Sequence, residues 1–357
     1  MASTWPPEVE LLRDLVAISS VSGTEEAIAR HLETTIKGWG LDVVRDDASV
    51  TVSVAGPDPG STLALVSHLD TVPAGDGWTR PPFSPVVDGG RMYGRGSGDA
   101  KASVASMLWA ARDYAGGHRR PGRLLVILGY GEETRHTTMG VAVSRAGSID
   151  AAVVGEPTNL DFAIAQRGLM MVDLLALGDQ RHAGYAAENG DFTNAVVSLS
   201  RDILKLGGLF RERVHPLLGL ATVTPTMVEA GISRNVTPPT AKAVLDVRST
   251  PSWTHQELAA ELRNALESEV TVTSDRLVPC ATPVGSGLLA HAARVRPESR
   301  QFGSPTCSDW VFLRDHDTFK CGPGTSRRSH TPDEHVDLAE VSAARLFYRR
   351  LAESFLA

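Results

Sequence analysis

Five short polar segments contain residues that could bind metal ions or move protons. The first spans residues 67–73, where His68 and Asp70 follow an apolar run and stand two positions apart. On an extended strand both side chains would lie on one face. A carboxylate beside a metal-binding histidine can accept a hydrogen bond from its second ring nitrogen. The pair alone does not distinguish a metal ligand from a strand-end histidine held by a loop aspartate.

Two further segments carry acidic groups at the ends of predicted elements. Asp99 follows a loop containing three glycines and stands where a helix begins, a position in which aspartate is also an ordinary N-cap. Glu132 and Glu133 directly follow a buried strand, and adjacent carboxylates repel one another unless a cation is present. One of them could bind metal while the other acts as a general base. A solvated acidic turn would have the same sequence.

The last two segments are residues 154–158, which contain Glu156, and residues 322–334, which contain His330. His335 competes with His330 for the same role, but it lies closer to the final predicted helix. Taken together, the five segments provide two histidines and three carboxylates that could act as ligands. Such a mixed nitrogen and oxygen set suits two Zn²⁺ ions, with Co²⁺ or Mn²⁺ as substitutes.

The elements that would position these residues indicate an α/β fold. Short apolar strands alternate with helices, which predicts a mostly parallel sheet covered by helices on both faces. From about residue 167 the pattern changes to an α+β unit of roughly 110 residues, the size of a small domain. Before this unit we expect strands at 63–66, 123–128 and 151–154 and a helix at 100–111; Ser22 and Glu25 also have capping-box spacing, which predicts a helix that runs to about residue 38. Within the unit we expect helices at 193–206 and 255–266 and strands at 221–229 and 241–247. After it we expect strands at 311–313 and 318–320 and a helix at 338–355.

Composition narrows the classes of protein that fit. The 357 residues are enough for two domains, and 35 basic against 42 acidic residues give a net charge of −7. An acidic chain is a poor partner for nucleic acid or for an anionic membrane. The three cysteines are widely spaced, which argues against a disulfide framework. With no signal peptide and no membrane-length apolar run expected, we predict a cytoplasmic protein.

These motifs, in this order, resemble the acetylornithine deacetylase and succinyl-diaminopimelate desuccinylase family, which consists of dinuclear zinc amidohydrolases related to the aminoacylases and glutamate carboxypeptidases. The likeness extends from residues 20–25 to the final helix. It implies a catalytic domain of residues 1–166 plus 279–357, interrupted by a lid and dimerisation domain of residues 167–278. The second domain is then inserted into the first.

The resemblance also implies roles for individual residues. His68 and Glu156 would hold one zinc ion, Glu133 and His330 would hold the other, and Asp99 would bridge them. Asp70 would orient His68, and Glu132 would be the general base. The peptide bond from Asp99 to Ala100 would be cis.

Three more residues are implicated through the predicted lid. His182 stands where the family has a histidine that reaches the partner subunit's site, so the resemblance implies a homodimer and stabilisation of an oxyanion. Asn235 and Arg248 match lid segments that would bind the substrate's carboxylate. Without the resemblance, these three would read as a surface loop histidine, a turn asparagine and a strand-edge arginine.

The implied function is metal-dependent hydrolysis of an N-acyl amino acid, a small molecule, with N-acetylornithine of arginine biosynthesis as first choice. Alternatives are release of lysine or ornithine from an amino-group carrier protein, succinyl-diaminopimelate desuccinylation, and dipeptidase or carboxypeptidase activity. A catalytically silent metal-binding regulator is the non-enzyme alternative. The chain departs from the family at residues 99–102, where Asp-Ala-Lys-Ala replaces the commoner Asp-Met-Lys-Gly, and at Arg181 and Cys307. None of these departures removes a proposed ligand.

Overall fold

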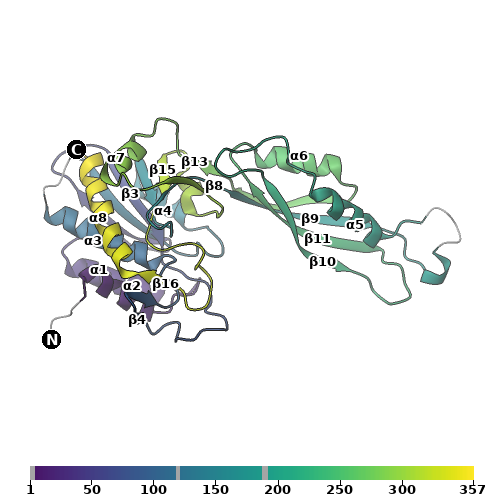
Figure 1. Cartoon of the computed structure of the whole chain (residues 1–357), viewed down its shortest axis with the longest axis horizontal. Helices are drawn as coiled ribbons and strands as arrows, with labels where there is room; N and C mark the ends of the chain where they lie inside the picture. Colours follow the sequence, from purple (N-terminus) through teal and green to yellow (C-terminus); the bar gives the residue numbers. More distant parts are fainter. Residues whose placement is uncertain (1–4, 118–120, 187–191) are drawn as a thin grey trace. The chain divides into compact units, whose positions relative to one another are not determined.

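The computed structural model describes residues 5–117, 121–186 and 192–357, and the chain forms two compact units (Figure 1). Unit 1 contains residues 1–164, 282–302 and 308–357, and unit 2 contains residues 165–281 and 303–307. The sequence placed the boundaries at 166/167 and 278/279 and left 303–307 with the first domain. Within this segment, Ser304 accepts a backbone hydrogen bond from Arg167 of unit 2.

Unit 1 contains most of a large sheet whose strands run in the order β1-β2-β6-β3-β7-β15-β8-β13, with β14 paired to β8. By the boundaries above, β13 and the last two residues of β8 and of β14 belong to unit 2. Pairing is parallel at the centre, between β6, β3, β7 and β15, and antiparallel where β1 meets β2 and β2 meets β6. Parallel pairing is therefore confined to the centre of the sheet. The strands are β1 Asp42–Arg45, β2 Ser49–Ala55, β3 Thr62–His68, β6 Arg123–Gly129, β7 Ala151–Val154, β8 Phe162–Gln166, β13 Cys280–Ala281, β14 Gln301–Ser304 and β15 Asp317–Lys320.

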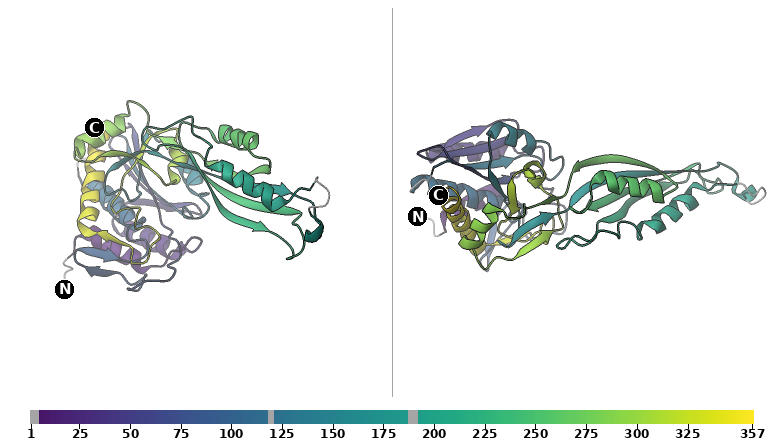
Figure 2. Two further views of the ribbon diagram at one scale, coloured as in Figure 1. Left: turned by 45° about the vertical axis from the view of Figure 1, so that its right-hand side comes forward. Right: turned by 90° about the horizontal axis from the view of Figure 1, so that it is seen from above.

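Helices pack on this sheet because its central strands are apolar on both faces. Alternate β3 residues such as Leu63 and Leu65 join one core with the buried faces of α1, α2, α3 and α8, and Figure 2 shows the yellow α8 along this unit. Helix α4 contacts β2 and β6. A small separate sheet pairs β16 with β5 and β5 with β4. The bounds are α1 Pro7–Ala17, α2 Glu26–Gly38, α3 Lys101–Gly116, α4 Met139–Ala146, α7 Gly287–Val295, α8 Leu338–Phe355, β4 Val86–Asp88, β5 Arg91–Tyr93 and β16 His335–Asp337.

Two local expectations for unit 1 were wrong. Residues 311–313 belong to a 3₁₀ helix, η2 (Asp309–Leu313), not to a strand. A short buried apolar run has the same sequence in either conformation. The capping-box spacing of Ser22 and Glu25 does not cap α2, which begins at Glu26 without a side-chain cap. Ser22 instead donates a hydrogen bond to Asp70.

Unit 2 is a four-stranded antiparallel sheet in the order β10-β11-β9-β12, with α5 and α6 packed on it. Its strands alternate in burial; in β9, Met170, Val172 and Leu174 enter the core with Leu199 of α5 and Leu262 of α6. Its elements are β9 Gly168–Leu177, η1 Ala183–Tyr185, α5 Ala195–Leu206, β10 Thr222–Ala230, β11 Thr240–Ser249, α6 His255–Ala265 and β12 Glu269–Leu277. Among the described residues of the whole chain, no helix is both long and apolar enough to cross a membrane.

Candidate metal centre

The polar segments singled out in the sequence meet at one edge of the large sheet. Strands β3, β6, β7 and β15 are mutually parallel, so their carboxyl ends share an edge, where open α/β sheets place their ligands. The register aligns these ends, because His68 pairs with Gly129 and Val154 pairs with both Val66 and Lys320. The loops that leave these strand ends carry Glu132 and Glu133, Glu156, and His330.

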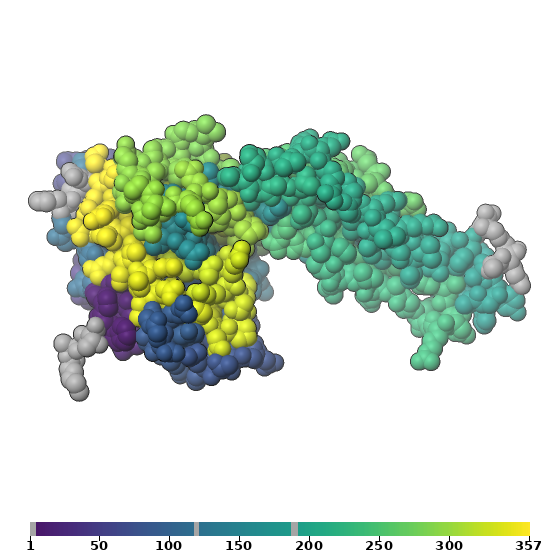
Figure 3. All heavy atoms as spheres, viewed as in Figure 1, coloured from purple at the N-terminus to yellow at the C-terminus, as the bar shows by residue number. Residues whose placement is uncertain are grey.

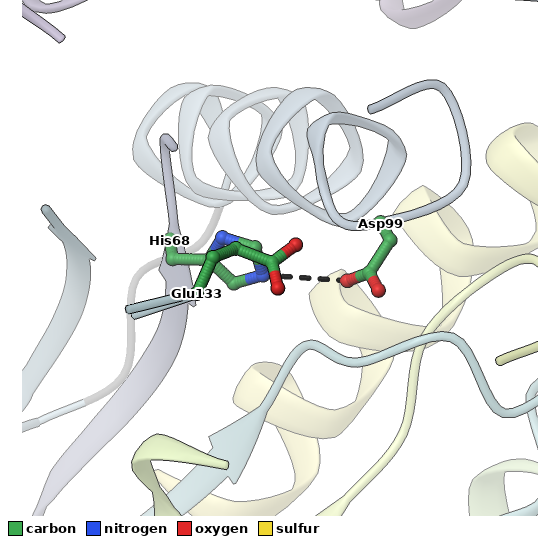
Figure 4. Close-up of side chains that lie close together, drawn as sticks. All are labelled: His68, Asp99 and Glu133. Carbon is green, nitrogen blue, oxygen red and sulfur yellow. Dashed lines mark hydrogen bonds and ion pairs between the residues drawn. The ribbon is translucent and has the colours of Figure 1, made fainter. Parts of the chain in front are cut away.

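His68 is held between two aspartates. Its Nδ1 lies 3.0 Å from the backbone oxygen of Asp70 and 3.4 Å from Asp70 Oδ1. Its Nε2 lies 3.3 Å from Asp99 Oδ1 (Figure 4) and 4.0 Å from Glu156 Oε1. Nδ1 is therefore turned towards Asp70, while Nε2 faces the carboxylates of the cluster.

Asp70 connects His68 to the two glutamates. Its carboxylate accepts hydrogen bonds from the backbone amides of Glu132 (3.0 Å) and Glu133 (3.1 Å) and from the Ser22 hydroxyl (2.7 Å). The Asp70 side chain is completely buried. Burial opposes ionisation of Asp70, but its hydrogen bond to His68 and the other donors lower its pKa to about 2. Asp70 is thus a fixed anion that orients both the imidazole and the start of the Glu132 loop.

Asp99 lies between the two candidate histidines. Its Oδ1 faces His68 Nε2, and its Oδ2 lies 3.8 Å from His330 Nε2. His330 Nε2 also lies 2.8 Å from Glu133 Oε2. Two carboxylate oxygens directed at two separate imidazoles are what a bridging ligand requires. The peptide bond from Asp99 to Ala100 is cis, as the resemblance implies.

The electrostatics of the cluster show a concentration of negative charge. Burial and the neighbouring Asp99 raise the pKa of Glu156 to about 8. The pKa of Glu132 rises well above its usual range through burial and the charges of Glu156 and Asp309. Burial disfavours the charged form of His68, yet its hydrogen bonds to Asp70 and Asp99 raise its pKa well above its usual range. Buried carboxylates that compete for protons in this way favour binding of a cation.

The donor set fits divalent metal. One ligand atom each from His68, Asp99 and Glu133 lies within 4.8 Å of the other two. Glu133 Oε1 is buried and has no hydrogen-bond partner among the described residues. An unsatisfied buried carboxylate oxygen is costly, and a metal ion would satisfy it. The nitrogen and oxygen donors suit zinc or a similar transition metal.

Two residues outside the proposed ligand set, His136 and Asp309, lie beside Glu132. His136 Nδ1 is 3.5 Å from Glu132 Oε1 and 3.1 Å from Asp309 Oδ1. These three residues form a second group whose ligand-type atoms lie within 4.8 Å of one another. The spacing of Glu132 and His136, four residues apart, is uninformative in a loop.

His335, the competitor of His330, has contacts with β5 and with its own loop. It is on β16, where it pairs with Tyr93, and the two rings pack with their centroids 4.7 Å apart. Its Nδ1 faces the backbone oxygen of Asp333 at 2.9 Å. The geometry therefore favours His330 as the second candidate imidazole ligand.

The three residues implicated in the lid all lie in unit 2. His182 and Asn235 are exposed on adjacent segments, since His182 forms a bridge with Val236 and Ala183 donates to the backbone oxygen of Asn235. Arg248 is half-buried near the end of β11 and forms an ion pair with Asp246, with the Nε nitrogen 2.7 Å from Oδ1. The roles that the resemblance gave them stay predictions.

Comparison with known proteins decides the family. The model of the peptidase family M20/M25/M40 matches residues 64–354. The chain belongs to this peptidase family. As an M20 family member it is a hydrolytic enzyme, and its large sheet and second sheet domain are those of the family's solved structures.

Relatives of this M20 protein include proteins named as a desuccinylase and as a deacetylase. Succinyl-diaminopimelate desuccinylase 2 of Ruegeria sp. (strain TM1040) is 30% identical over 378 residues, covering 97% of this chain and 94% of the relative. Acetylornithine deacetylase of Erwinia tasmaniensis is 28% identical over 395 residues, covering 99% of each chain.

Solved structures show the shared fold at lower identity. The aminopeptidase PepT of Bacillus cereus has a TM-score of 0.83 at 19% identity and covers 98% of each chain. The YXEP protein of Bacillus subtilis, described as a dinuclear metal-binding peptidase of the M20 family, has a TM-score of 0.77 at 16% identity, covering 98% of this chain and 97% of its own.

Proposed function

We propose that this M20 family member is a dinuclear zinc enzyme that hydrolyses the amide bond of an N-acyl amino acid. The observation that carries the proposal is Asp99, whose two carboxylate oxygens face His68 and His330. N-acetylornithine, a substrate of arginine biosynthesis, is the specific substrate we propose. The relative named acetylornithine deacetylase supports that choice by its coverage of 99% of both chains.

The proposed ligands divide into two sets that share Asp99. His68 and Glu156 would hold one ion, and Glu133 and His330 would hold the other. Divalent metal in such a site activates water and polarises the substrate's carbonyl group. Asp70 would maintain the tautomer of His68 by accepting a hydrogen bond from Nδ1–H.

Glu132 is the proposed general base. Burial and nearby carboxylates raise its pKa, which makes Glu132 a stronger base than an exposed glutamate. The Asp70 carboxylate accepts a hydrogen bond from the backbone amide of Glu132 and so fixes the position of this residue. Glu132 would take a proton from the attacking water and deliver it to the leaving amine.

The lid residues would act in a homodimer. His182 lies just before η1 and is bridged to Val236, on the segment that leads to Thr240, the first residue of β11. Arg248 is eight residues further along that strand. At about 3.3 Å per residue, the two ends of this stretch are roughly 26 Å apart. One copy of unit 2 therefore cannot bring His182 and Arg248 to the same small substrate, but two copies could each contribute one of them. The edge strand β10, with exposed Met227 and Val228, is where we propose that a second copy packs.

Succinyl-diaminopimelate is the main rival substrate. The relative at 30% identity is named as a desuccinylase, as are several others at 26–28%. Carrier-protein hydrolysis and dipeptide hydrolysis remain as further rivals from the sequence. We propose that the enzyme works in the cytoplasm, the compartment that its three widely spaced cysteines favour.

A release assay tests the proposal. The purified protein, loaded with zinc, is incubated with N-acetylornithine, succinyl-diaminopimelate, a lysine-bearing carrier protein and dipeptides, and the released amine is measured. We expect release from N-acetylornithine, lost on chelation and restored by zinc. Release from succinyl-diaminopimelate alone would overturn the proposed substrate but support the proposed amide hydrolysis. Zinc bound without release from any substrate would favour the regulatory protein.

Size measurement tests the homodimer separately. Gel filtration with light scattering should give about twice the 38.1 kDa chain mass. His182→Ala should then lower turnover without changing that mass. A fully active monomer would rule out the role of His182 in a partner's site.

A further inference from the structure

Glu334 makes an unusual set of contacts for a residue outside the proposed ligand set. Its Oε1 accepts hydrogen bonds from the backbone amides of Gly98 (2.9 Å) and Asp99 (3.0 Å). Its Oε2 accepts from the Gly96 amide (3.1 Å) and from Arg95 Nη1 (2.7 Å). One carboxylate thus binds four donors from the loop that ends in Asp99.

Glu334 and Arg95 form a buried ion pair. Glu334 is 1% exposed and Arg95 is 2% exposed. Arg95 also donates to the backbone oxygens of Ala74 (3.0 Å) and Thr331 (3.3 Å), and its guanidinium lies over the Trp78 ring. The attraction within a buried ion pair offsets the cost of burying two charges only when the geometry is good and further hydrogen bonds are made. Here the further hydrogen bonds to Glu334 come from the Asp99 loop, while Arg95 Nε has no partner among the described residues.

Glu334 is four positions after His330, so it connects the segment that carries His330 with the loop that carries Asp99. His330 and Asp333 have φ angles of 64° and 53°, a backbone conformation that non-glycine residues keep only where their surroundings impose it. Asp333 accepts from the Thr79 amide (3.0 Å) and hydroxyl (2.8 Å), which ties the segment to a second loop. Figure 3 shows yellow atoms of the C-terminal part of the chain beside blue atoms of this region.

We propose that Glu334 is a positioning residue for the metal centre, which sets the Asp99 carboxylate and the His330 imidazole at a fixed separation. It holds Asp99 through that residue's own amide and holds His330 through the short segment between them. The proposal rests on the dinuclear centre of the proposed function. Its consequence is that Glu334 governs metal affinity although it binds no metal itself.

Glu334→Gln tests the role. Glutamine has the same shape but loses the negative charge that four donors now share. Residues that orient metal ligands typically change metal affinity by about 10–100-fold when substituted. We expect a fall of that size in zinc affinity, measured by competition with a chromophoric chelator. Excess zinc should restore turnover in Glu334→Gln, because the substitution weakens the site without removing a reacting group.

Glu8→Gln is the matched control. Glu8 is 2% exposed, accepts from the Ser342 hydroxyl, and is paired with Arg345 at 2.5 Å. It is therefore a buried, ion-paired carboxylate of unit 1 that is not hydrogen-bonded to the Asp99 loop. We expect this variant to lose stability but to keep the parent's zinc affinity.

The outcomes separate the two proposals. Equal zinc affinity in Glu334→Gln and the parent would overturn the role of Glu334 alone. A parent chain that binds no zinc would overturn both the metal centre and this role. If Glu334→Gln does not fold, the double variant Arg95→Gln with Glu334→Gln removes the unpaired buried charge, and parent-like affinity in that folded protein would also overturn the proposal.

Discussion

Two buried carboxylates, Asp202 in unit 2 and Glu133 in unit 1, differ in a way that separates structure from chemistry. Asp202 is fully buried and accepts from the Lys205 ammonium, from the backbone amides of Glu267 and Ser268, and from the Ser268 hydroxyl. Glu133 has a buried oxygen with no partner among the described residues. A satisfied buried carboxylate stabilises a fold, whereas an unsatisfied one among other carboxylates indicates a ligand site.

The same contrast holds for the surroundings of the two residues. Around Glu133, the neighbours His68, Asp99 and Glu156 place several titratable groups within a few ångströms. Around Asp202, the donors are the side chains of Lys205 and Ser268 and the backbone amides of the segment that follows α6. Both carboxylates are buried, so burial alone does not distinguish the two sites. The number of hydrogen-bond donors around each carboxylate does.

The largest effect that would test this contrast is on turnover. Glu132→Gln removes the proposed base but keeps the side chain's shape, and general-base removal typically costs about 10²–10⁴-fold in rate. We expect kcat to fall by that factor, with zinc content and unfolding temperature unchanged. The control Glu298→Gln alters an exposed glutamate that pairs with Arg296 and should keep the parent's kcat. Parent-like turnover in Glu132→Gln would remove the assignment.

Metal removal should affect the two units unequally. A ligand that binds only the folded state stabilises it by about 2.7 kcal/mol at 100 times its Kd. Chelation should therefore lower the protection of amides around β3 and β6 in hydrogen exchange and leave those of β9 and β11 unchanged. Asp99→Asn should abolish the difference between the zinc-loaded and chelated states. Equal loss of protection in both units would contradict a metal site confined to unit 1.

Asp202→Ala should have the converse outcome. Its donors lose their acceptor inside a folded domain, which costs about 1–3 kcal/mol for each buried group left unsatisfied. We expect a lower denaturant midpoint for unit 2, followed by hydrogen exchange in β9 and β12, with zinc affinity unchanged. A change in zinc affinity would show that Asp202 is not purely structural.

The smallest effect concerns His255, which is buried in unit 2 between the Ser249 hydroxyl (2.8 Å) and the backbone oxygen of Asp275 (2.7 Å). Burial lowers its pKa. The folded state therefore binds a proton less readily than the unfolded chain, so this residue costs stability as the pH falls below about 6.5, the ordinary histidine pKa. We expect His255→Gln to reduce the loss of unit 2 stability between pH 8 and pH 5.5 in urea unfolding. An unchanged pH dependence would show that another group dominates.

The sequence by itself determined the chemistry available and much of the local structure. Apolar runs such as 123–128 and 151–154 indicated strands, because a strand buried on both faces needs continuous apolar residues. The motif order was enough to indicate the family, which comparison confirmed. Ser22 and residues 311–313 were misread because spacing does not show what a side chain or a short apolar run will contact.

Only the tertiary structure decided how residues far apart in the chain meet. The parallel register brings His68, Glu133 and Glu156 to one edge from strands that are up to 88 residues apart. No local pattern shows that Glu334 accepts from the Asp99 amide across 235 positions, or that Asp309 and His136 lie beside Glu132. Hydrogen bonds and ion pairs depend on distances of a few ångströms, and those distances are set by packing of the whole sheet and not by neighbours in sequence.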